Sequence, residues 1–335
     1  LEDVLKGLQA SFASLKENVK KKYGISLKKL RSMGISAMMH GLIALGKENE
    51  LLAPFRTWRN TNTKDAADEL SELFQFNIPQ RWSIAHFWQQ VLDGEEHIHK
   101  INKMMTLSSY VHYLLSGRFV LGIGDASGMF PTVAGEARYD PEMLEKLNKR
   151  LAERKIGYQL QEILPQPLKA GEEAGRLTLA GAHLLDPTGE LLPDVMMCPP
   201  EGDAGTGMVA TNSVRPLTGN ISAGTSVFVM IVLKNRLSRY YREIDVVATP
   251  SGAHVAMVHC NNCSSELNAF ADMFSQLSSM AQEKADRGAA LSAMFEAAET
   301  AETDCGGIIS CNYLSGEHIT GFSAGRPLIA RTPDS

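Results

Sequence analysis

Two short stretches of the chain carry side chains that could do chemistry, EGDAGTG at 201–207 and AGTS at 223–226. In the first, Asp203 lies among glycine and alanine, so no bulky neighbour would keep a substrate from its carboxylate. Such an aspartate can accept a proton from a hydroxyl group held within hydrogen-bond reach. An Asp beside Gly also commonly forms an Asx turn. The sequence therefore offers Asp203 as a candidate general base, with a turn residue as the alternative.

The second stretch has the composition of a turn that binds an anion. Gly224 would let the backbone approach a ligand closely, while Thr225 and Ser226 offer hydroxyl and N–H groups. The chain has no GxxxxGK[ST] motif, and the glycines of GIGDASG at 122–128 do not have the GxGxxG spacing. AGTS is thus the candidate phosphate turn, and a plain hairpin turn is the alternative.

Other candidates are single residues with two readings each. Asp125, in GIGDASGMF, is a rival base, and His40 ends a predicted strand before a glycine, where α/β proteins often bind ligands. Trp58 precedes a polar run and could stack on a sugar, or fill a core. Cys260 and Cys263 form a CxxC, but without a second ligand pair the structural reading is favoured over a zinc site. No metal ligands are assigned.

The elements that must position these residues follow from hydrophobic spacing. The pattern predicts an amphipathic helix at 1–22, a strand at 30–45 that is broken at Gly34 and at His40–Gly41, and a helical region at 64–118. Beyond these it predicts a glycine-rich strand pair at 203–234, a further strand at 254–260 and a long helix at 264–300. The last helix would present an inner face of Leu267, Phe270, Phe274, Leu277 and Met280. Mixed helices and strands predict an α/β fold.

Length and composition predict two domains. A chain of 335 residues, 44% of them hydrophobic, is too long for one ordinary core. The proline- and glycine-containing segment LLPDVMMCPPEGD is the candidate boundary. We therefore expect domains at 1–200 and 201–335, with a cleft between them.

Charge and hydropathy limit the partners. A net charge of −5 gives no electrostatic reason to expect nucleic acid or an anionic membrane. No run approaches the roughly 20 apolar residues of a membrane span, and no signal-like segment opens the chain. The five cysteines are odd in number and sparse, which favours reduced thiols. These features predict a cytoplasmic protein.

Taken together, the motifs resemble those of the FGGY family of carbohydrate kinases, which includes xylulokinase, ribulokinase, gluconokinase and glycerol kinase. MMHG at 38–41, APFRTWRNTNT at 53–63 and YLSGEH at 313–318 resemble family motifs and keep their order along essentially the whole chain. The Gly-Asp and AGTS stretches fit the same pattern.

The resemblance implies an actin-like ATPase (ribonuclease H-like) fold, with two α/β domains around a cleft. It implies Asp203 as general base, the Gly224, Thr225 and Ser226 turn on the nucleotide phosphates, and Met39, His40 and Trp58 in the sugar pocket. The activity would be phosphoryl transfer from ATP, with Mg²⁺, to a hydroxyl of a ketose such as xylulose or of a polyol. A homodimer is the candidate assembly.

The chain also departs from the family pattern. It opens on a helix rather than on the Asp-x-Gly-Thr motif, and it ends at ARTPDS, before the glycine-rich adenine-binding region. Ala204 stands where xylulokinases and glycerol kinases tend to have an amide, and Asn60 and Asn62 stand where many members have charged residues. A catalytically silent sugar-binding or assembly fragment is therefore the alternative. Bare ATP hydrolysis would leave MMHG and Trp58 unexplained.

Overall fold

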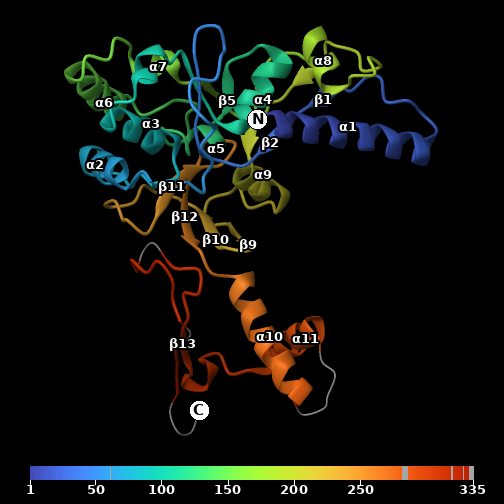
Figure 1. Ribbon diagram of the computed structural model, residues 1–335, viewed down its shortest axis with the longest axis vertical. Helices are drawn as coiled ribbons and strands as arrows, with labels where there is room; N and C mark the ends of the chain where they lie inside the picture. The colour runs from blue at the N-terminus through green and yellow to red at the C-terminus, as the bar shows by residue number, and fades with distance from the viewer. Residues whose placement is uncertain (61, 281–285, 318–319, 327, 332–335) are drawn as a thin grey trace. The chain divides into compact units, whose positions relative to one another are not determined.

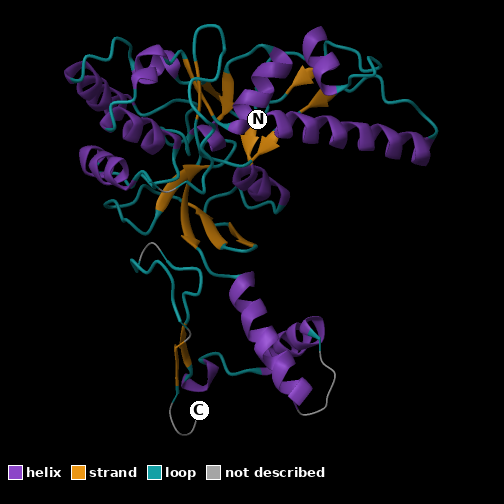
Figure 2. Cartoon of the chain, in the orientation of Figure 1, coloured by secondary structure: helices purple, strands orange, loops and turns teal. Residues whose placement is uncertain are grey.

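The computed structural model describes residues 1–60, 62–280, 286–317, 320–326 and 328–331 (Figure 1). The chain divides into two compact units. The larger unit comprises Leu1–Gly219 and Ile231–Ala256, and the smaller unit comprises Asn220–Met230 and Met257–Ser335. Each unit combines helices with short strands (Figure 2), so the predicted α/β class is confirmed.

Helices make up most of the regular structure of the larger unit. They are α1 (Glu2–Tyr23), α2 (Lys64–Phe74), α3 (Ser83–Leu92), α4 (Leu107–Ser116), α5 (Ile123–Ala126), α6 (Pro141–Glu153), α7 (Leu160–Ile163), α8 (Leu179–Leu185) and α9 (Asp203–Ala210), with a 3₁₀ turn at Glu96–Lys100.

Short strands in the larger unit join segments that are far apart in sequence. β1 (Ser32–Met33) pairs in parallel with β7 (Met196–Met197), and β2 (Ser36–Ala37) pairs in parallel with β8 (Glu201–Gly202). β5 (Val120–Gly122) is parallel to β6 (Gln166–Leu168), and β3 (Ile43–Leu45) is antiparallel to β4 (Lys103–Met105). The strand predicted at 30–45 is therefore confirmed as three pieces. Its breaks fall at Gly34 and around His40–Gly41, as expected.

The remaining strands and helices follow residue 218. β11 (Asp245–Ala248), β12 (His254–Cys260), β10 (Val227–Val232) and β9 (Gly219–Ala223) form a four-stranded sheet in that order. The smaller unit also contains α10 (Ser264–Met280), α11 (Arg287–Thr300), a 3₁₀ turn at Cys305–Gly307, and β13 (Ile309–Cys311) antiparallel to β14 (Leu328–Ala330).

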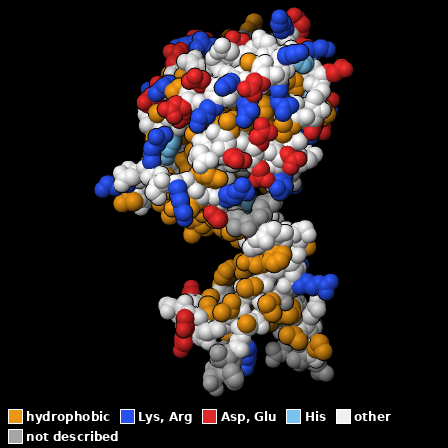
Figure 3. All heavy atoms as spheres, turned by 90° about the vertical axis from the view of Figure 1, so that its left-hand side faces the viewer, with side chains coloured by type: hydrophobic (Ala, Val, Ile, Leu, Met, Phe, Trp, Pro, Cys, Tyr) orange, Lys and Arg blue, Asp and Glu red, His pale blue; other side chains and the backbone are white. Residues whose placement is uncertain are grey.

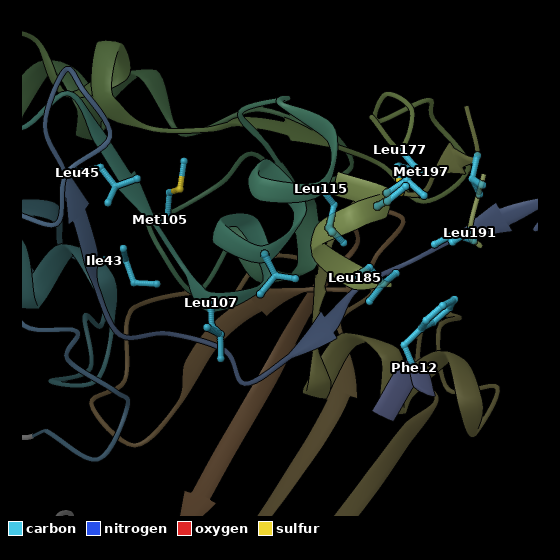
Figure 4. Close-up of a cluster of buried hydrophobic side chains, with 13 residues drawn as sticks. Phe12, Ile43, Leu45, Met105, Leu107, Leu115, Leu177, Leu185, Leu191 and Met197 are labelled. Atoms are coloured by element: carbon cyan, nitrogen blue, oxygen red, sulfur yellow. The ribbon is translucent and has the colours of Figure 1, made fainter. Parts of the chain in front are cut away.

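The first helix shows how the sequence pattern becomes packing. Gly24 ends α1 in the left-handed region at φ 69° and donates its N–H to the carbonyl of Lys20. Phe12 is buried in the cluster drawn in Figure 4, which also includes Leu107, Leu115 and Leu185. The predicted helix at 1–22 is thus confirmed, and its first turns pack on the core that supports the larger unit.

The structure corrects two element predictions in the larger unit. Residues 103–105 were expected to be helical and instead form β4, because they pair with β3; Thr106 then caps α4 by accepting a hydrogen bond from Ser109 N. Residues 203–210 were expected to be strand and form α9. In both places tertiary contacts outweigh local sequence preference.

A third correction concerns the smaller unit. Most of the predicted inner face of its first helix is exposed: Leu277 is 54% and Met280 82% accessible, while Phe270 is half-buried and Ala271 is the buried residue of α10. Figure 3 shows hydrophobic side chains on the visible surface of this unit. The contact with α11 covers only part of the apolar stripe of α10. Residues 281–285 of the predicted 264–300 helix lie outside the described residues.

Gly181 provides a test of the packing of α8 on α4. A Cβ at this position would lie 2.1 Å from the carbonyl oxygen of Leu115, which also accepts hydrogen bonds from Thr178. We expect Gly181→Ala to lower the free energy of unfolding by about 1–3 kcal/mol, measured by urea denaturation.

Gly7→Ala is the matched control, because a Cβ at Gly7 in α1 would meet nothing within 4 Å. The same substitution there should leave stability unchanged or raise it by up to about 1 kcal/mol, through helix propensity. Equal effects at the two glycines would contradict the close contact at Gly181.

Candidate functional site

Asp203 lies where β8 ends and α9 begins. It is the first residue of α9, its side chain is exposed, and β8 is held beside β2 in the register Ser36–Glu201 and Ala37–Gly202. Its Oδ1 accepts hydrogen bonds from the backbone N–H of Met39, at 3.3 Å, and of Ala204, at 3.0 Å. These contacts orient one carboxylate oxygen on the chain and leave the side chain accessible to a substrate.

Met39 and Asp203 are brought together by close packing at Gly202. A Cβ at Gly202 would lie 2.1 Å from Cγ of Met39, which is itself buried. Only glycine therefore lets β8 approach the Met39 side chain this closely. Two of the residues singled out from the sequence, Met39 and Asp203, are neighbours in the structure.

His40 lies in the loop between β2 and β3 with an unusual backbone. Its φ is 66°, in the left-handed region, and its ring is buried. The ring stacks on Trp82 with centroids 6.2 Å apart, and Nδ1 lies 3.1 Å from the carbonyl oxygen of Gly128. A Cβ at Gly128 would come within 2.6 Å of Nδ1. The imidazole is thus held in one orientation, immediately after Met39.

The Trp58 segment runs alongside the His40 loop. Leu42 and Arg56 exchange backbone hydrogen bonds at 2.8 and 3.2 Å. The Trp58 ring is half-buried, and the guanidinium of Arg59 lies over it at 5.2 Å from the centroid. Thr61, within the APFRTWRNTNT motif, and His318, within YLSGEH, lie outside the described residues.

Behind Asp203 lies a buried pair of carboxyl groups, one of which the sequence analysis did not single out. Glu201 is buried, and its two carboxyl oxygens accept hydrogen bonds from the N–H groups of Gly124, at 3.1 Å, and Asp125, at 2.9 Å. A Cβ at Gly122 or at Gly124 would lie within 2.5 Å of this carboxyl group. Gly122 and Gly124 of the GIGDASG stretch therefore make room for Glu201. In the sequence, the only signal for a role of Glu201 was its position directly before the Gly-Asp pair.

Asp125, the rival base, is fully buried in the structure. Its Oδ2 accepts hydrogen bonds from the hydroxyls of Thr106 and Ser108, while its Oδ1 has no partner in the described part of the chain. A substrate in solvent cannot reach this carboxyl group in the structure. Asp203 is the exposed one of the two.

Burial raises the pKa of both inner carboxyls. Desolvation raises the pKa of Asp125 to about 7, opposed by the hydroxyls of Ser108 and Thr106 and reinforced by the charge of Asp203. Desolvation, followed by the charge of Asp125, raises the pKa of Glu201 to about 8. Near neutral pH the two groups together therefore retain protons.

The candidate phosphate turn belongs to the smaller unit. The Gly224 N–H donates to the carbonyl of Ser226 at 2.8 Å, and the Ser226 hydroxyl lies 3.3 Å from Nε2 of His259. A Cβ at Gly224 would make only an ordinary contact, 3.7 Å from the Ser226 carbonyl oxygen. The turn connects β9 to β10, so the predicted turn at 224–226 is confirmed as a local structure.

Metal and membrane features are few. Within the described ranges, no cluster of three or more His, Cys, Asp or Glu side chains is arranged to hold a metal ion. All five cysteines are free, Cys260 and Cys263 among them. Among the same residues, no helix combines the length and apolar character needed to cross a bilayer.

Family models match most of the chain. The model of the FGGY family of carbohydrate kinases, N-terminal domain, matches residues 2–186, and that of the C-terminal domain matches residues 219–335. The chain belongs to the FGGY family of carbohydrate kinases, as the sequence resemblance predicted. Neither match covers 187–218, so the domain boundary near residue 200 stays a prediction.

Curated relatives and solved structures agree with this family. The chain is 26% identical over 210 residues to a xylulose kinase of Haemophilus influenzae and 20% identical over 158 residues to one of Staphylococcus xylosus. It spans 40% and 31% of the lengths of these relatives.

Among solved structures, a ligand-bound xylulose kinase of Lactobacillus acidophilus matches 99% of the chain at a TM-score of 0.75 and 17% identity. A gluconate kinase of the same organism matches 97% at 0.71 and 18%. The chain covers 63% of each of these structures. The likeness establishes the actin-like ATPase fold.

The buried carboxyls make the stability of the chain depend on pH. The folded chain keeps protons on Asp125 and Glu201 that the unfolded chain releases above about pH 4. Their contribution to the free energy of unfolding is therefore full at low pH and is lost as the pH rises through the folded pKa values of about 7 and about 8.

We expect Asp125→Asn, whose amide oxygen can still accept from Thr106 and Ser108, to reduce the fall in stability between pH 5 and pH 7. The reduction should be up to about 1.4 kcal/mol per pH unit, measured by urea denaturation at several pH values. Glu145→Gln, on the exposed face of α6, removes the same charge and should leave the pH dependence unchanged. Parallel curves for Asp125→Asn and the parent chain would refute the assignment.

Proposed function

We propose that the protein transfers the γ-phosphoryl group of ATP to a hydroxyl of a sugar, with Asp203 as general base. The observation that carries the proposal is the geometry of Asp203, exposed at the β8–α9 junction and oriented by Met39 N–H, in a chain of the FGGY family. Relatives named xylulose kinase favour a ketose as substrate, with a polyol as the second choice.

In the proposed reaction the oriented carboxylate removes the proton of the substrate hydroxyl as its oxygen attacks the γ-phosphorus of ATP. Oδ1 is held by the two backbone N–H groups, and no hydrogen bond to Oδ2 is found among the described residues, so Oδ2 is the oxygen suited to take the proton. The neutral forms of Asp125 and Glu201 keep further negative charge away from this carboxylate near neutral pH.

We propose Met39, His40 and Trp58 as the sugar-binding residues. Met39 contacts the Asp203 segment directly, and the His40 ring follows it with its orientation fixed by Gly128 and Trp82. A half-buried indole such as Trp58 can stack on the face of a sugar. Ala204 and the asparagines at 60 and 62 would then give a sugar environment different from that of typical xylulokinases.

For the nucleotide we propose the turn at Gly224, Thr225 and Ser226. The space around Gly224 would accept a Cβ, so packing within the chain does not require glycine at this position. Close approach of a phosphate to the backbone would be a reason for glycine there. Mg²⁺ would supply neutralisation of the phosphate oxygens, and it commonly needs only one or two carboxylates besides them. We also propose that the protein has domains at 1–200 and 201–335, lies in the cytoplasm and forms a homodimer.

The first test is Asp203→Asn. Loss of a general base is expected to lower sugar-dependent ADP formation by about 10²–10⁴-fold, measured with Mg-ATP and a panel of ketopentoses, ketohexoses and polyols. Asp93→Asn, a matched change at an exposed position, should retain full activity. The assay uses the 335-residue chain, which spans less than half of the length of its curated relatives.

The alternative, a catalytically silent sugar-binding or assembly module, predicts a different result. It would give saturable sugar binding, no ADP formation in any form, and the same sugar affinity in Asp203→Asn and the parent chain. ADP release that does not depend on sugar would instead support simple ATP hydrolysis and count against both readings.

The second test concerns His40. Asparagine tolerates the left-handed backbone at this position, so His40→Asn removes the imidazole with little strain. If the ring contacts the sugar, KM for the sugar should rise by about fivefold or more, with a smaller change in KM for ATP. His183→Asn, at an exposed histidine, is the control. Unchanged sugar KM in His40→Asn would remove this residue from the proposed sugar site.

A further inference from the structure

The larger unit contains a cavity that none of the proposed active-site residues lines. Its volume is about 420 Å³. Its lining includes Arg236, Arg239 and Tyr240 from the segment after β10, and Phe76 and Asn77 from the segment after α2. Cavities of about 300–1,000 Å³ are typical of sites for small molecules.

The segment after β10 is locally basic in a chain that is acidic overall. Residues 234–243 contain four cations and a single acid, in the sequence KNRLSRYYRE. Arg242 pairs with Asp68 at 3.3 Å. Arg236 and Arg239 line the cavity, and in the described part of the chain neither forms an ion pair. Two arginines therefore face the cavity with no ion-pair partner among the described residues.

The other titratable groups of the cavity offset only part of this charge. The carboxylate of Asp140 accepts hydrogen bonds from the N–H groups of Glu142 and Met143 and so caps α6. His254 donates its Nε2–H to the carbonyl oxygen of Thr132, and burial lowers its pKa, so the ring is neutral at pH 7. The cavity thus combines one capping carboxylate with two unpaired guanidinium groups.

Aromatic side chains give the cavity a second kind of surface. Phe76, Tyr240 and Tyr241 are among its lining residues, and the guanidinium of Arg239 lies 4.9 Å from the centroid of the Tyr241 ring. Arginines recognise phosphate oxygens through two parallel N–H bonds, and aromatic faces pack against sugars. The two features together suit a ligand with a phosphate at one end and a carbon skeleton at the other.

We propose that this cavity binds a small sugar phosphate, at a site separate from the proposed active site. Arg236 and Arg239 bind the phosphate monoester, and the aromatic wall contacts the sugar. The site requires neither ATP nor turnover, so its existence does not depend on the proposed kinase activity.

The test is isothermal titration of the 335-residue chain with a ketopentose 5-phosphate, without ATP. We expect saturable binding of one molecule per chain, weakened by about tenfold or more in Arg236→Gln/Arg239→Gln. Both arginines are exposed, so the variant should fold, which its unfolding curve will verify.

Lys234→Gln is the matched control, because Lys234 lies in the same basic segment but does not line the cavity. Its affinity should stay within about twofold of the parent chain. Undiminished binding in the double variant would mean that the sugar phosphate binds elsewhere, and an equal loss in Lys234→Gln would mean nonspecific attraction. Either result, or no binding by the parent chain at millimolar concentration, overturns the proposal.

Discussion

The parallel pairing of β2 with β8 is the interaction on which the candidate site depends. It brings together residues 164 positions apart, so that Met39 N–H reaches the carboxylate of Asp203. Two-residue strands provide few hydrogen bonds by themselves. The contact is extended by β1 and β7, which run beside each other in the same direction, and by bonds from Cys198 N–H to Met33 and from Glu201 N–H to Ile35. The whole segment from β1 to β2 therefore lies against the segment that ends in Asp203.

The same junction explains why a buried acid is tolerated so close to an exposed one. Burial of an isolated carboxylate is costly unless hydrogen bonds compensate it or it takes up a proton. Glu201 does both: two N–H groups of α5 contact it, and its pKa is raised. Burial raises the pKa of both inner carboxyls; the charge of Asp203 adds to the rise for Asp125, and the charge of Asp125 adds to the rise for Glu201. The negative charge of the group is therefore concentrated at the exposed position. A proton acceptor accessible to solvent is the chemical result.

Local signals in the sequence predicted the elements that have clear ends. The helix closed by Gly24 and the three pieces of the 30–45 strand follow from residue types acting over a few positions. The helix at 203–210 could not be predicted in this way, because its glycines and threonines have low helix propensity. It forms where the chain leaves β8, and a Cβ at Gly205 would lie 3.3 Å from Cγ of Pro250.

The residues around the candidate site could be named from the sequence only in part, for a related reason. Asp203, Met39 and His40 carry recognisable motifs, whereas Glu201 is a charged residue of a type that is usually exposed. Its burial depends on the absence of side chains at glycines nearly 80 residues away, which no local pattern reveals. Net charge was similarly uninformative about local electrostatics. A chain of net charge −5 has four cations and a single acid within residues 234–243. Two of these cations, Arg236 and Arg239, line a cavity together with aromatic side chains.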